Sequence, residues 1–265
     1  MGECAQPSAG LMGLDRPSRG VSESSVCAVE VRGLTKVYAT GLRALAGIDL
    51  TIPQRQIFGL IGPNGAGKST TIRILATLLK PTGGTAQVLG HDVVGDPMAV
   101  RKIISYLPED AGAYERLSGL EYLRFMGGFY EGDPNAMVAL GESIAGLGDR
   151  INSKVSEYSN GMKRRLLIGR TLMTSPQLAI LDEPTSGLDV IHAHHVRRKV
   201  RERIDSTGAT AIITSHNMLE IEFLCDRVAF IDRGRILGEG TPSELKQRFG
   251  KPNLEDVFLE MAAHG

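Results

Sequence analysis

Eight consecutive residues have the types and spacing of a phosphate-binding P-loop, and Thr70 follows them: Gly62, Pro63, Asn64, Gly65, Ala66, Gly67, Lys68 and Ser69. Glycines let the backbone bend until successive N–H groups face an anion, and the positive end of a following helix adds its partial charge. At this spacing Lys68 reaches the β- and γ-phosphates, and the Ser69 hydroxyl ligates magnesium. The alternative is a glycine-rich turn that binds nothing. Because an apolar run typical of a buried strand precedes the loop and a helical pattern follows it, we expect a site for ATP with Mg²⁺.

Two adjacent acids, Asp182 and Glu183, end a second apolar run, Leu178 to Leu181. Ligands of parallel α/β sheets lie at the carboxyl ends of the strands, so we expect both acids beside the P-loop. Alternation along a strand sends neighbouring side chains in opposite directions. We therefore predict that Asp182 holds magnesium through water and that Glu183 polarises the water that attacks the γ-phosphate. The alternative is a solvated strand end with two surface acids.

A second anion site is predicted where Ser159, Asn160, Gly161 and Met162 open a helix shortly before the acids. A serine hydroxyl, backbone N–H groups and a helix N-terminus together attract phosphate, although a simple helix cap has the same residues. The segment and its spacing before Asp182 resemble the signature motif of ABC-type ATPases, Leu-Ser-Gly-Gly-Gln. Ser159 and the second glycine, Gly161, are retained.

The resemblance covers nearly the whole chain from Val26 onward and implies further roles. In this family the signature binds the γ-phosphate held by the P-loop of a partner subunit, so that two chains enclose two ATP molecules. Tyr38 corresponds to an aromatic that stacks on adenine, and Asp189 ends a match to the D-loop at the dimer seam. His216 corresponds to the switch histidine, which contacts the γ-phosphate and orients the water or Glu183. Without the resemblance, Tyr38 would be an ordinary strand residue and His216 a polar residue at a strand end.

Three positions depart from the family pattern. Glu109 stands where the family has the Q-loop glutamine; a carboxylate can also approach magnesium through water, but it adds negative charge to the site. Gln54-Arg55-Gln56 replaces a Gly-Glu turn, and Asn160 replaces the first signature glycine. Asparagine caps helices and tolerates unusual backbone angles. None of these changes removes a catalytic group.

One branch of the family combines a glutamate at the Q-loop, a Ser-x-Gly-Met signature and a tail like Leu254 to Phe258. This branch contains the ATPase subunits of prokaryotic exporters of drugs, antibiotics, sodium or polysaccharides. The resemblance implies separate transmembrane permease subunits, contacted by the stretch from Glu109 to Leu117, and a second ATPase subunit that forms a homodimer in the ATP-bound state. It also implies a cytoplasmic position, peripheral on the cytoplasmic face of the cell membrane. The alternative function is a soluble ABC ATPase for iron–sulfur assembly, translation or DNA maintenance; a small-molecule kinase would need neither the signature nor the histidine.

Strand-sized apolar runs alternate with helical patterns, which predicts an α/β fold. Together with the resemblance, this indicates a P-loop NTPase (RecA-like) core with an antiparallel β subdomain and an inserted helical subdomain. The expected strands are Val26 to Val31, Gly47 to Ile52, Ile57 to Ile61, Leu178 to Leu181, Thr210 to Thr214, and a hairpin of Val228 to Ile231 with Arg235 to Gly238.

Capping signals place the helices of the chain. A helix from near Lys68 to before Pro81 and another from Val190 to Ser206 flank the core, and the box at Thr241 to Glu244 starts one that stops at Gly250. Capping signals at Ser118 with Glu121 and at Asp133-Pro134 mark the helical subdomain, about residues 100–173. We expect a flexible N-terminal tail at 1–26, with a cleaved or wrongly assigned start as the alternative. The ATPase domain is expected at 27–250 and a helical C-terminal tail at 251–265.

The composition excludes several classes of protein. The 30 basic and 30 acidic residues cancel, which offers no electrostatic attraction for nucleic acid, and none is expected as a partner. No apolar run approaches the ~20 residues of a membrane span. The three cysteines have neither metal spacing nor a close pair, which fits a reducing compartment. These features favour a water-soluble protein.

Three further patterns are assigned to ordinary structure. His192, His194 and His195 do not share one helix face and lack a carboxylate or cysteine to complete a metal set. Ala193, Val196, Val200 and Ile204 are instead expected on the buried face of that helix. The basic run Lys163 to Arg165 lies on a helix and needs no nucleic acid. An apolar stripe at helical spacing is expected to pack on the core, with contact to a partner as the alternative: Leu254, Val257, Phe258 and Met261.

Overall fold

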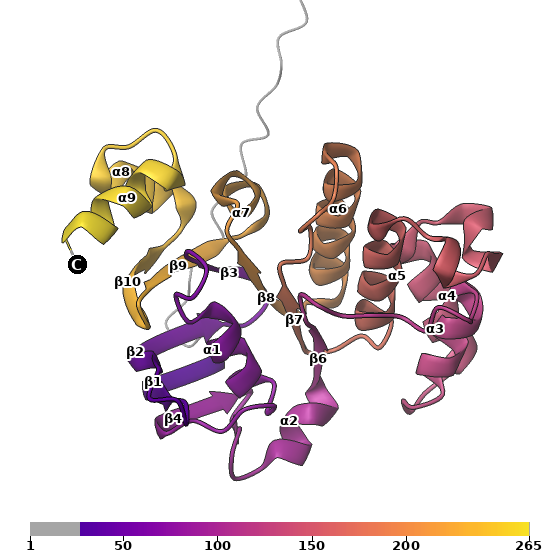
Figure 1. Cartoon of the computed structure of the whole chain (residues 1–265), viewed down its shortest axis with the longest axis horizontal. Coiled ribbons are helices and arrows are strands. Elements are labelled where there is room, and N and C mark those ends of the chain that lie inside the picture. The colour runs from indigo at the N-terminus through magenta and orange to yellow at the C-terminus, as the bar shows by residue number, and fades with distance from the viewer. Residues whose placement is uncertain (1–26, 265) are drawn as a thin grey trace, which may run out of the picture.

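The structure is a computed structural model that describes residues 27–264, so the predicted N-terminal tail, Val26 and Gly265 lie outside the described residues. Two sheets form its framework (Figure 1). The strands are β1 (Cys27–Val37), β2 (Arg43–Pro53), β3 (Ile57–Ile61), β4 (Gly83–Val88), β5 (His91–Asp92), β6 (Ile104–Leu107), β7 (Leu178–Asp182), β8 (Thr210–Ser215), β9 (Arg227–Asp232) and β10 (Arg235–Gly240).

The larger sheet has the strand order β10-β9-β3-β8-β7-β6. Its strands are parallel except for β10, which pairs antiparallel with β9 as the predicted hairpin. Every residue of β3, β7 and β8 is buried, because parallel strands in the middle of such a sheet are covered on both faces. The strand predictions for these three segments are confirmed, and with them the α/β class. The carboxyl ends of β3, β7 and β8 lie side by side, where the P-loop, the two acids and His216 follow.

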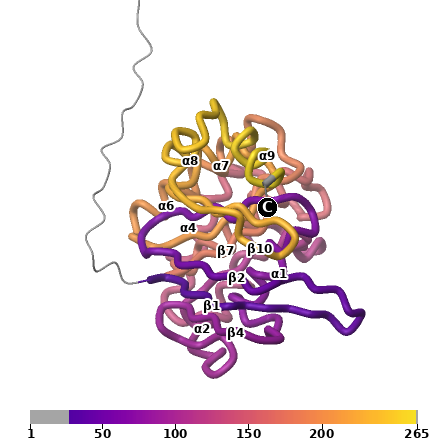
Figure 2. Tube along the Cα trace, turned by 90° about the vertical axis from the view of Figure 1, so that its left-hand side faces the viewer, coloured from indigo at the N-terminus to yellow at the C-terminus, as the bar shows by residue number. Residues whose placement is uncertain are grey.

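The smaller sheet has the order β2-β1-β4-β5 and is antiparallel. The β1–β2 pair was expected, but β4 and β5 were not predicted. The turn before β3 contains Arg55 with φ of +63°, a left-handed conformation that glycine adopts more easily. Figure 2 shows the turn between β1 and β2 extending beyond the body of the chain. This sheet places Leu45 of β2 against the P-loop, as described below.

Helices cover the larger sheet and form a separate group beyond β6 (Figure 1). The predicted caps at Ser118, Asp133, Asp189 and Thr241 all accept hydrogen bonds from helical N–H groups, which confirms the corresponding helix starts. The helices are α1 (Lys68–Leu75), α2 (Pro97–Ile103), α3 (Gly119–Gly127), α4 (Pro134–Ala145), α5 (Asn160–Leu172), α6 (Val190–Thr207), α7 (Met218–Leu224), α8 (Pro242–Phe249) and α9 (Leu254–His264), with 3₁₀ turns at Gly148–Asn152 and Val155–Glu157.

The group beyond β6 contains α3, α4 and α5, in the region predicted as a helical subdomain. Residues 104–107 themselves form β6 of the larger sheet, so the helical segment proper begins after them. At the other end of the chain, α9 packs its Phe258 ring 5.6 Å from the ring of Phe230 in β9. Leu254, Val257 and Met261 are buried, which confirms the core-packing interpretation of this stripe. The boundaries at residues 250 and 251 stay predictions.

The expected inner face of α6 is confirmed, because Ala193, Val196, Val200 and Ile204 are its buried residues. His192 Nδ1 lies 2.6 Å from Asp189 and His195 Nε2 lies 3.3 Å from the Ile144 carbonyl, so the histidines have ordinary partners. Within residues 27–264 no cluster of three or more potential metal ligands of the His, Cys, Asp and Glu types occurs. None of the helices in the same residues has the length and apolar character of a membrane span.

Candidate functional site

The P-loop connects β3 to α1, and two of its glycines, Gly62 and Gly67, stand where a side chain would not fit. A Cβ on Gly62 would lie 2.1 Å from the Ile231 carbonyl oxygen, and one on Gly67 would lie 2.8 Å from Cδ2 of Leu45. Gly67 is the N-cap of α1 with φ of +115° and no side-chain cap. The first N–H groups of α1 are therefore left for a ligand, and the backbone approaches the site closely.

Lys68 points back into this loop and is only 6% exposed. Its ammonium donates to the carbonyl oxygens of Gly62, at 2.6 Å, and Pro63, at 3.2 Å. Oε1 of Glu183 lies 3.9 Å from the same nitrogen. Burial lowers the pKa of Lys68, while the nearby carboxylates of Glu183, Asp182 and Glu109 act in the opposite direction. The loop thus holds a positive charge with little solvent around it, next to a cradle of backbone N–H groups.

Asp182 ends β7 and is 1% exposed. Its Oδ1 accepts a 2.5 Å hydrogen bond from the Thr214 hydroxyl of β8, and Ser69 hydrogen-bonds to the same carboxylate. Burial raises the pKa of Asp182, these two hydroxyls lower it, and Glu109 raises it. Glu109 itself is exposed. The Ser69 hydroxyl and the Asp182 carboxylate, the predicted magnesium ligands, therefore meet in the structure.

Glu183 follows with φ of +48°, a left-handed backbone that a non-glycine residue adopts at a cost of about 1–3 kcal/mol. The strand β7 ends at Asp182, so the predicted alternation of side chains along a strand does not apply to Glu183. The left-handed turn at Glu183 is what sends the side chains of Asp182 and Glu183 in different directions. The side chain is 5% exposed, and its Oε2 lies 3.0 Å from Nδ1 of His216. Burial raises the pKa of Glu183, whereas His216 and Lys68 lower it and Glu109 raises it. One carboxylate oxygen thus faces Lys68 and the other faces His216.

Tyr38 directly follows β1 and lies beside the first turn of α1. Its hydroxyl is 3.1 Å from the Thr70 hydroxyl of α1, and the Lys36 ammonium lies 5.4 Å from its ring centroid. The side chain is half-buried. Tyr38 therefore stands next to the residue that follows Ser69, and its contact with adenine stays a prediction.

The signature residues and Asp189 lie elsewhere. Ser159 is exposed, and its hydroxyl accepts from the Met162 N–H at 3.2 Å as the N-cap of α5. A Cβ on Gly161 would be 3.5 Å from Leu188, just before α6. Asp189 is the cap of α6. Figure 1 shows α1 and α5 on different sides of β6 and β7. One copy of the chain thus carries two separate groups of predicted phosphate-binding residues.

Sequence reasoning missed polar residues that support the site. Arg164, from the run set aside as an ordinary basic segment, is buried under the turn at Glu183. Arg164, Leu167, Ile168 and Thr171 are all buried on α5. An arginine at this helical spacing with apolar residues is the signal that points to a buried partner. Thr214 is the second such residue: a threonine in a fully buried strand beside the acids needs a hydrogen-bond partner, and its hydroxyl finds one in Asp182.

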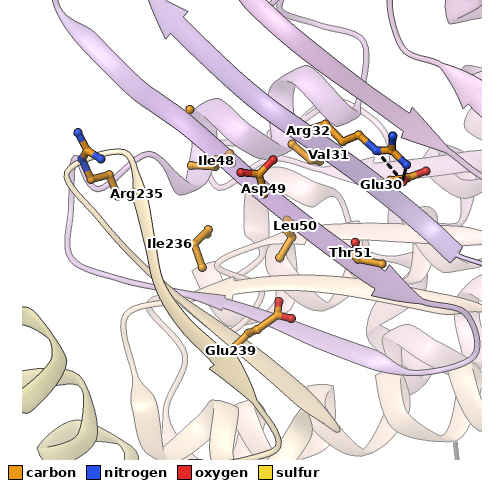
Figure 3. Close-up of a pocket in the computed structure, with 11 residues that line it drawn as sticks. Glu30, Val31, Arg32, Ile48, Asp49, Leu50, Thr51, Arg235, Ile236 and Glu239 are labelled. Carbon is orange, nitrogen blue, oxygen red and sulfur yellow. Dashed lines mark hydrogen bonds and ion pairs between the residues drawn. The ribbon is translucent and has the colours of Figure 1, made fainter. Parts of the chain in front are cut away.

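The residues present fit ATP and magnesium. The cradle has no room for a Cβ at Gly62 or Gly67, its helix N-terminus lacks a side-chain cap, and a buried ammonium lies within it. The oxygen ligands that Mg²⁺ prefers are present at Ser69 and Asp182. A shallow hollow of about 570 Å³ lies elsewhere, between β1–β2 and β10 (Figure 3), and none of the predicted site residues lines it.

Comparison with known proteins gives the family. A sequence model described as ABC transporter matches residues 45–186. The daunorubicin/doxorubicin resistance ATP-binding protein of Streptomyces peucetius is 45% identical over 226 residues, which are 84% of this chain and 68% of that protein. The linearmycin resistance ATP-binding protein of Bacillus subtilis is 38% identical, over 83% of this chain and 70% of that protein.

The fold agrees with a solved structure described as the ATP binding subunit of an ABC transporter. That structure superposes with a TM-score of 0.79 at 28% identity, over 89% of this chain and 99% of that chain. Fold and site together define a P-loop ATPase that uses ATP with Mg²⁺. The chain belongs to the ABC transporter family and is an ATP-binding subunit of this family, as the signature motif suggested.

Proposed function

We propose that the chain drives export by a separate transmembrane permease and that two copies close around two ATP molecules during each cycle. The relatives named for resistance to daunorubicin, doxorubicin and linearmycin support export rather than uptake. The proposed place of action is the cytoplasmic face of the cell membrane, where ATP and a permease meet.

Each group around the P-loop has a role in this proposal. Lys68 and the N–H groups of the loop bind the β- and γ-phosphates, and Tyr38 stacks on adenine. Ser69 and Asp182 hold Mg²⁺, with Glu109 in reach through water. When bound, the ion neutralises negative charge that develops on the phosphates. His216 binds the γ-phosphate and orients Glu183.

The observation that carries the proposal is the way Glu183 is held. Its two carboxylate oxygens face different cationic or proton-bearing groups, Lys68 at 3.9 Å and His216 at 3.0 Å. Burial raises its pKa, which makes this carboxylate a better proton acceptor than an exposed glutamate. Glu183 would take the proton of the attacking water as the water approaches the γ-phosphate. Among the acids within residues 27–264, Glu183 is the one that contacts both Lys68 and His216.

The second group of phosphate-binding residues requires a second copy. Ser159 and Gly161 open α5, apart from α1 in the same chain (Figure 1). The γ-phosphate that they bind therefore belongs to the P-loop of another subunit. The exposed Ser159 hydroxyl and the turn before Asp189 then lie along the seam between the two copies.

The surface proposed for the permease includes an exposed aromatic group on α3 and on the loops before and after it. The rings of Tyr114, Phe125 and Phe129 stack edge to face, with centroid separations of 5.4 and 5.1 Å. The three residues are 57%, 46% and 68% exposed. Exposed aromatic groups of this kind mark contact with other proteins. Tyr114 lies inside the stretch from Glu109 to Leu117, which joins this surface to the site.

Phosphate release from ATP tests the role of Glu183. The Glu183→Gln variant keeps the size of the side chain but loses the base, so we expect hydrolysis to fall by about 10²- to 10⁴-fold while ATP affinity is retained. The matched control is Glu202→Gln, because Glu202 is exposed and pairs with Lys199 on α6. Turnover of Glu183→Gln at the wild-type rate would exclude Glu183 as the base.

A further inference from the structure

Arg164 of α5 has an unusual environment. It is 7% exposed, and its guanidinium donates to the carbonyl oxygens of five residues. Nε donates to Pro184 at 3.1 Å, and Nη2 donates to Asp182 at 2.5 Å and Glu183 at 2.7 Å. Nη1 donates to Pro108 at 3.0 Å and to Glu109 at 3.1 Å. One side chain therefore joins α5 to the segments that follow β6 and β7.

These bonds fix the backbone on both sides of Glu183. The peptide between Asp182 and Glu183 is held at its carbonyl by Arg164, and its N–H donates to the Thr214 hydroxyl at 3.0 Å. The next peptide has no N–H, because Pro184 follows, so its carbonyl is the only group through which hydrogen bonds can hold it. That carbonyl accepts from Arg164 and from the Ser186 N–H at 3.1 Å.

Fixing these two peptides matters because Glu183 has φ of +48°. Such a backbone persists only where surrounding contacts over-determine it. The direction of the Glu183 side chain toward Lys68 and His216 depends on this torsion. A change in the turn would move the carboxylate away from both, and misplacement of a reacting group by about 1 Å lowers rates by about 10²-fold.

We propose that Arg164 is a positioning residue for hydrolysis: it holds the left-handed turn at Glu183, and it ties that turn to α5 and to the backbone at Glu109. The inference rests on the proposed role of Glu183 as the base. Movement of α5, whose first turn carries Ser159, must either carry the Glu183 turn with it or break these hydrogen bonds. Arg164 does not touch nucleotide in this account, so ATP binding does not require it.

The test compares Arg164→Ala and Arg164→Lys with a matched control, Arg170→Ala, in the full chain. Arg170 lies on the same helix and interacts with the Tyr122 hydroxyl rather than with the site. For Arg164→Ala we expect kcat to fall by about 10- to 100-fold, with the Kd of a fluorescent ATP analogue within about two-fold of wild type. Arg164→Lys keeps the charge but cannot reach five carbonyls, and its kcat should fall similarly. Arg170→Ala should retain the wild-type kcat.

Guanidinium at low millimolar concentration supplies a readout that simple loss of stability would not give. It should restore part of the kcat of Arg164→Ala by filling the vacated position, and it should not raise the kcat of Arg170→Ala. The proposal is overturned if both Arg164 variants turn over at the wild-type rate, or if their kcat falls only in step with ATP affinity and guanidinium restores nothing. Failure of Glu183→Gln to lose activity would instead refute the proposed function, so the two failures are distinguishable.

Discussion

Thr214→Val removes one hydroxyl that serves both acids of the site. The Thr214 hydroxyl donates to Asp182 Oδ1 at 2.5 Å and accepts from the Glu183 N–H at 3.0 Å, and the residue is fully buried. Valine has nearly the same shape, so the change deletes hydrogen bonds without opening a cavity. We predict lower stability and weaker use of Mg²⁺, because the Asp182 carboxylate loses a hydrogen-bond donor at a buried position.

The expected loss of stability follows from the hydrogen bond between the Thr214 hydroxyl and the Asp182 carboxylate, because its acceptor is charged. A hydrogen bond to a charged group contributes about 1.5–3 kcal/mol, and about 2 kcal/mol lowers the Tm of a chain of this size by about 4–8 °C. Burial raises the pKa of the Asp182 carboxyl above 3.8, so the folded chain binds a proton at Asp182 more tightly than the unfolded chain does. Stability contributed by such a group is lost as pH rises above the unfolded pKa. The Thr214 hydroxyl lowers the pKa of Asp182, so its removal raises this pKa further. The loss of folding free energy in Thr214→Val relative to wild type should therefore be larger at pH 7, where Asp182 is ionised in wild type, than at pH 4.

Thermal unfolding at several pH values measures this prediction, and ATP hydrolysis titrated with Mg²⁺ measures the functional part. The matched control is Thr171→Val, since Thr171 is also fully buried but its hydroxyl donates to the Leu167 carbonyl within α5. Removing that neutral hydrogen bond costs about 0.5–1.5 kcal/mol, and the loss does not depend on pH. A Thr214→Val variant with the same Tm loss as Thr171→Val at every pH, and an unchanged Mg²⁺ requirement, would refute the reasoning.

Two further predictions concern the same site. Protonated Glu183 cannot accept a proton, and burial raises the pKa of its carboxyl, so kcat should fall on acidification at a pH above the usual range of a glutamate. His216 lowers the pKa of Glu183. The His216→Ala variant should therefore show the acid limb of its pH–rate profile at a higher pH than wild type. An acid limb that moves to lower pH would contradict this. Gly62→Ala should abolish ATP binding, because its Cβ would lie 2.1 Å from the Ile231 oxygen, whereas Gly127→Ala, with 3.9 Å to the nearest atom, should bind a fluorescent ATP analogue normally. Normal ATP binding by Gly62→Ala would show that the loop has more room than the structure gives it.

The fold was predictable where one signal sufficed. Buried strands such as β3 and β8 have nearly continuous apolar sequences, which predict strands. Capping residues such as Ser118 and Thr241 predicted the first residues of their helices. The strand β4 could not be predicted because it begins with Gly83 and Gly84, and glycine is depleted in strands and typical of turns. Its pairing is with β1, far away along the chain. The short helix α7 was missed because seven residues carry too little periodicity.

The chemical groups of the candidate site were predictable from the sequence, but the hydrogen bonds that hold Asp182 and Glu183 in place were not. The P-loop, Asp182, Glu183 and His216 follow strands that the sequence marked, and parallel pairing brings those strand ends together. The helical spacing of Arg164 with apolar residues indicates that it is buried, but its partners are backbone carbonyls, which have no sequence signature. The left-handed turn at Glu183 is likewise invisible in the sequence, since glutamate rarely adopts it.

Light scattering of Glu183→Gln with and without ATP and Mg²⁺ tests the central claim most directly. The variant binds ATP in this account but cannot release the closed state by hydrolysis. We predict the mass of one chain without nucleotide and the mass of two chains with ATP and Mg²⁺. A mass of one chain in both conditions, with ATP shown to be bound, would contradict the claim that the P-loop of one copy and Ser159 of another enclose the same nucleotide.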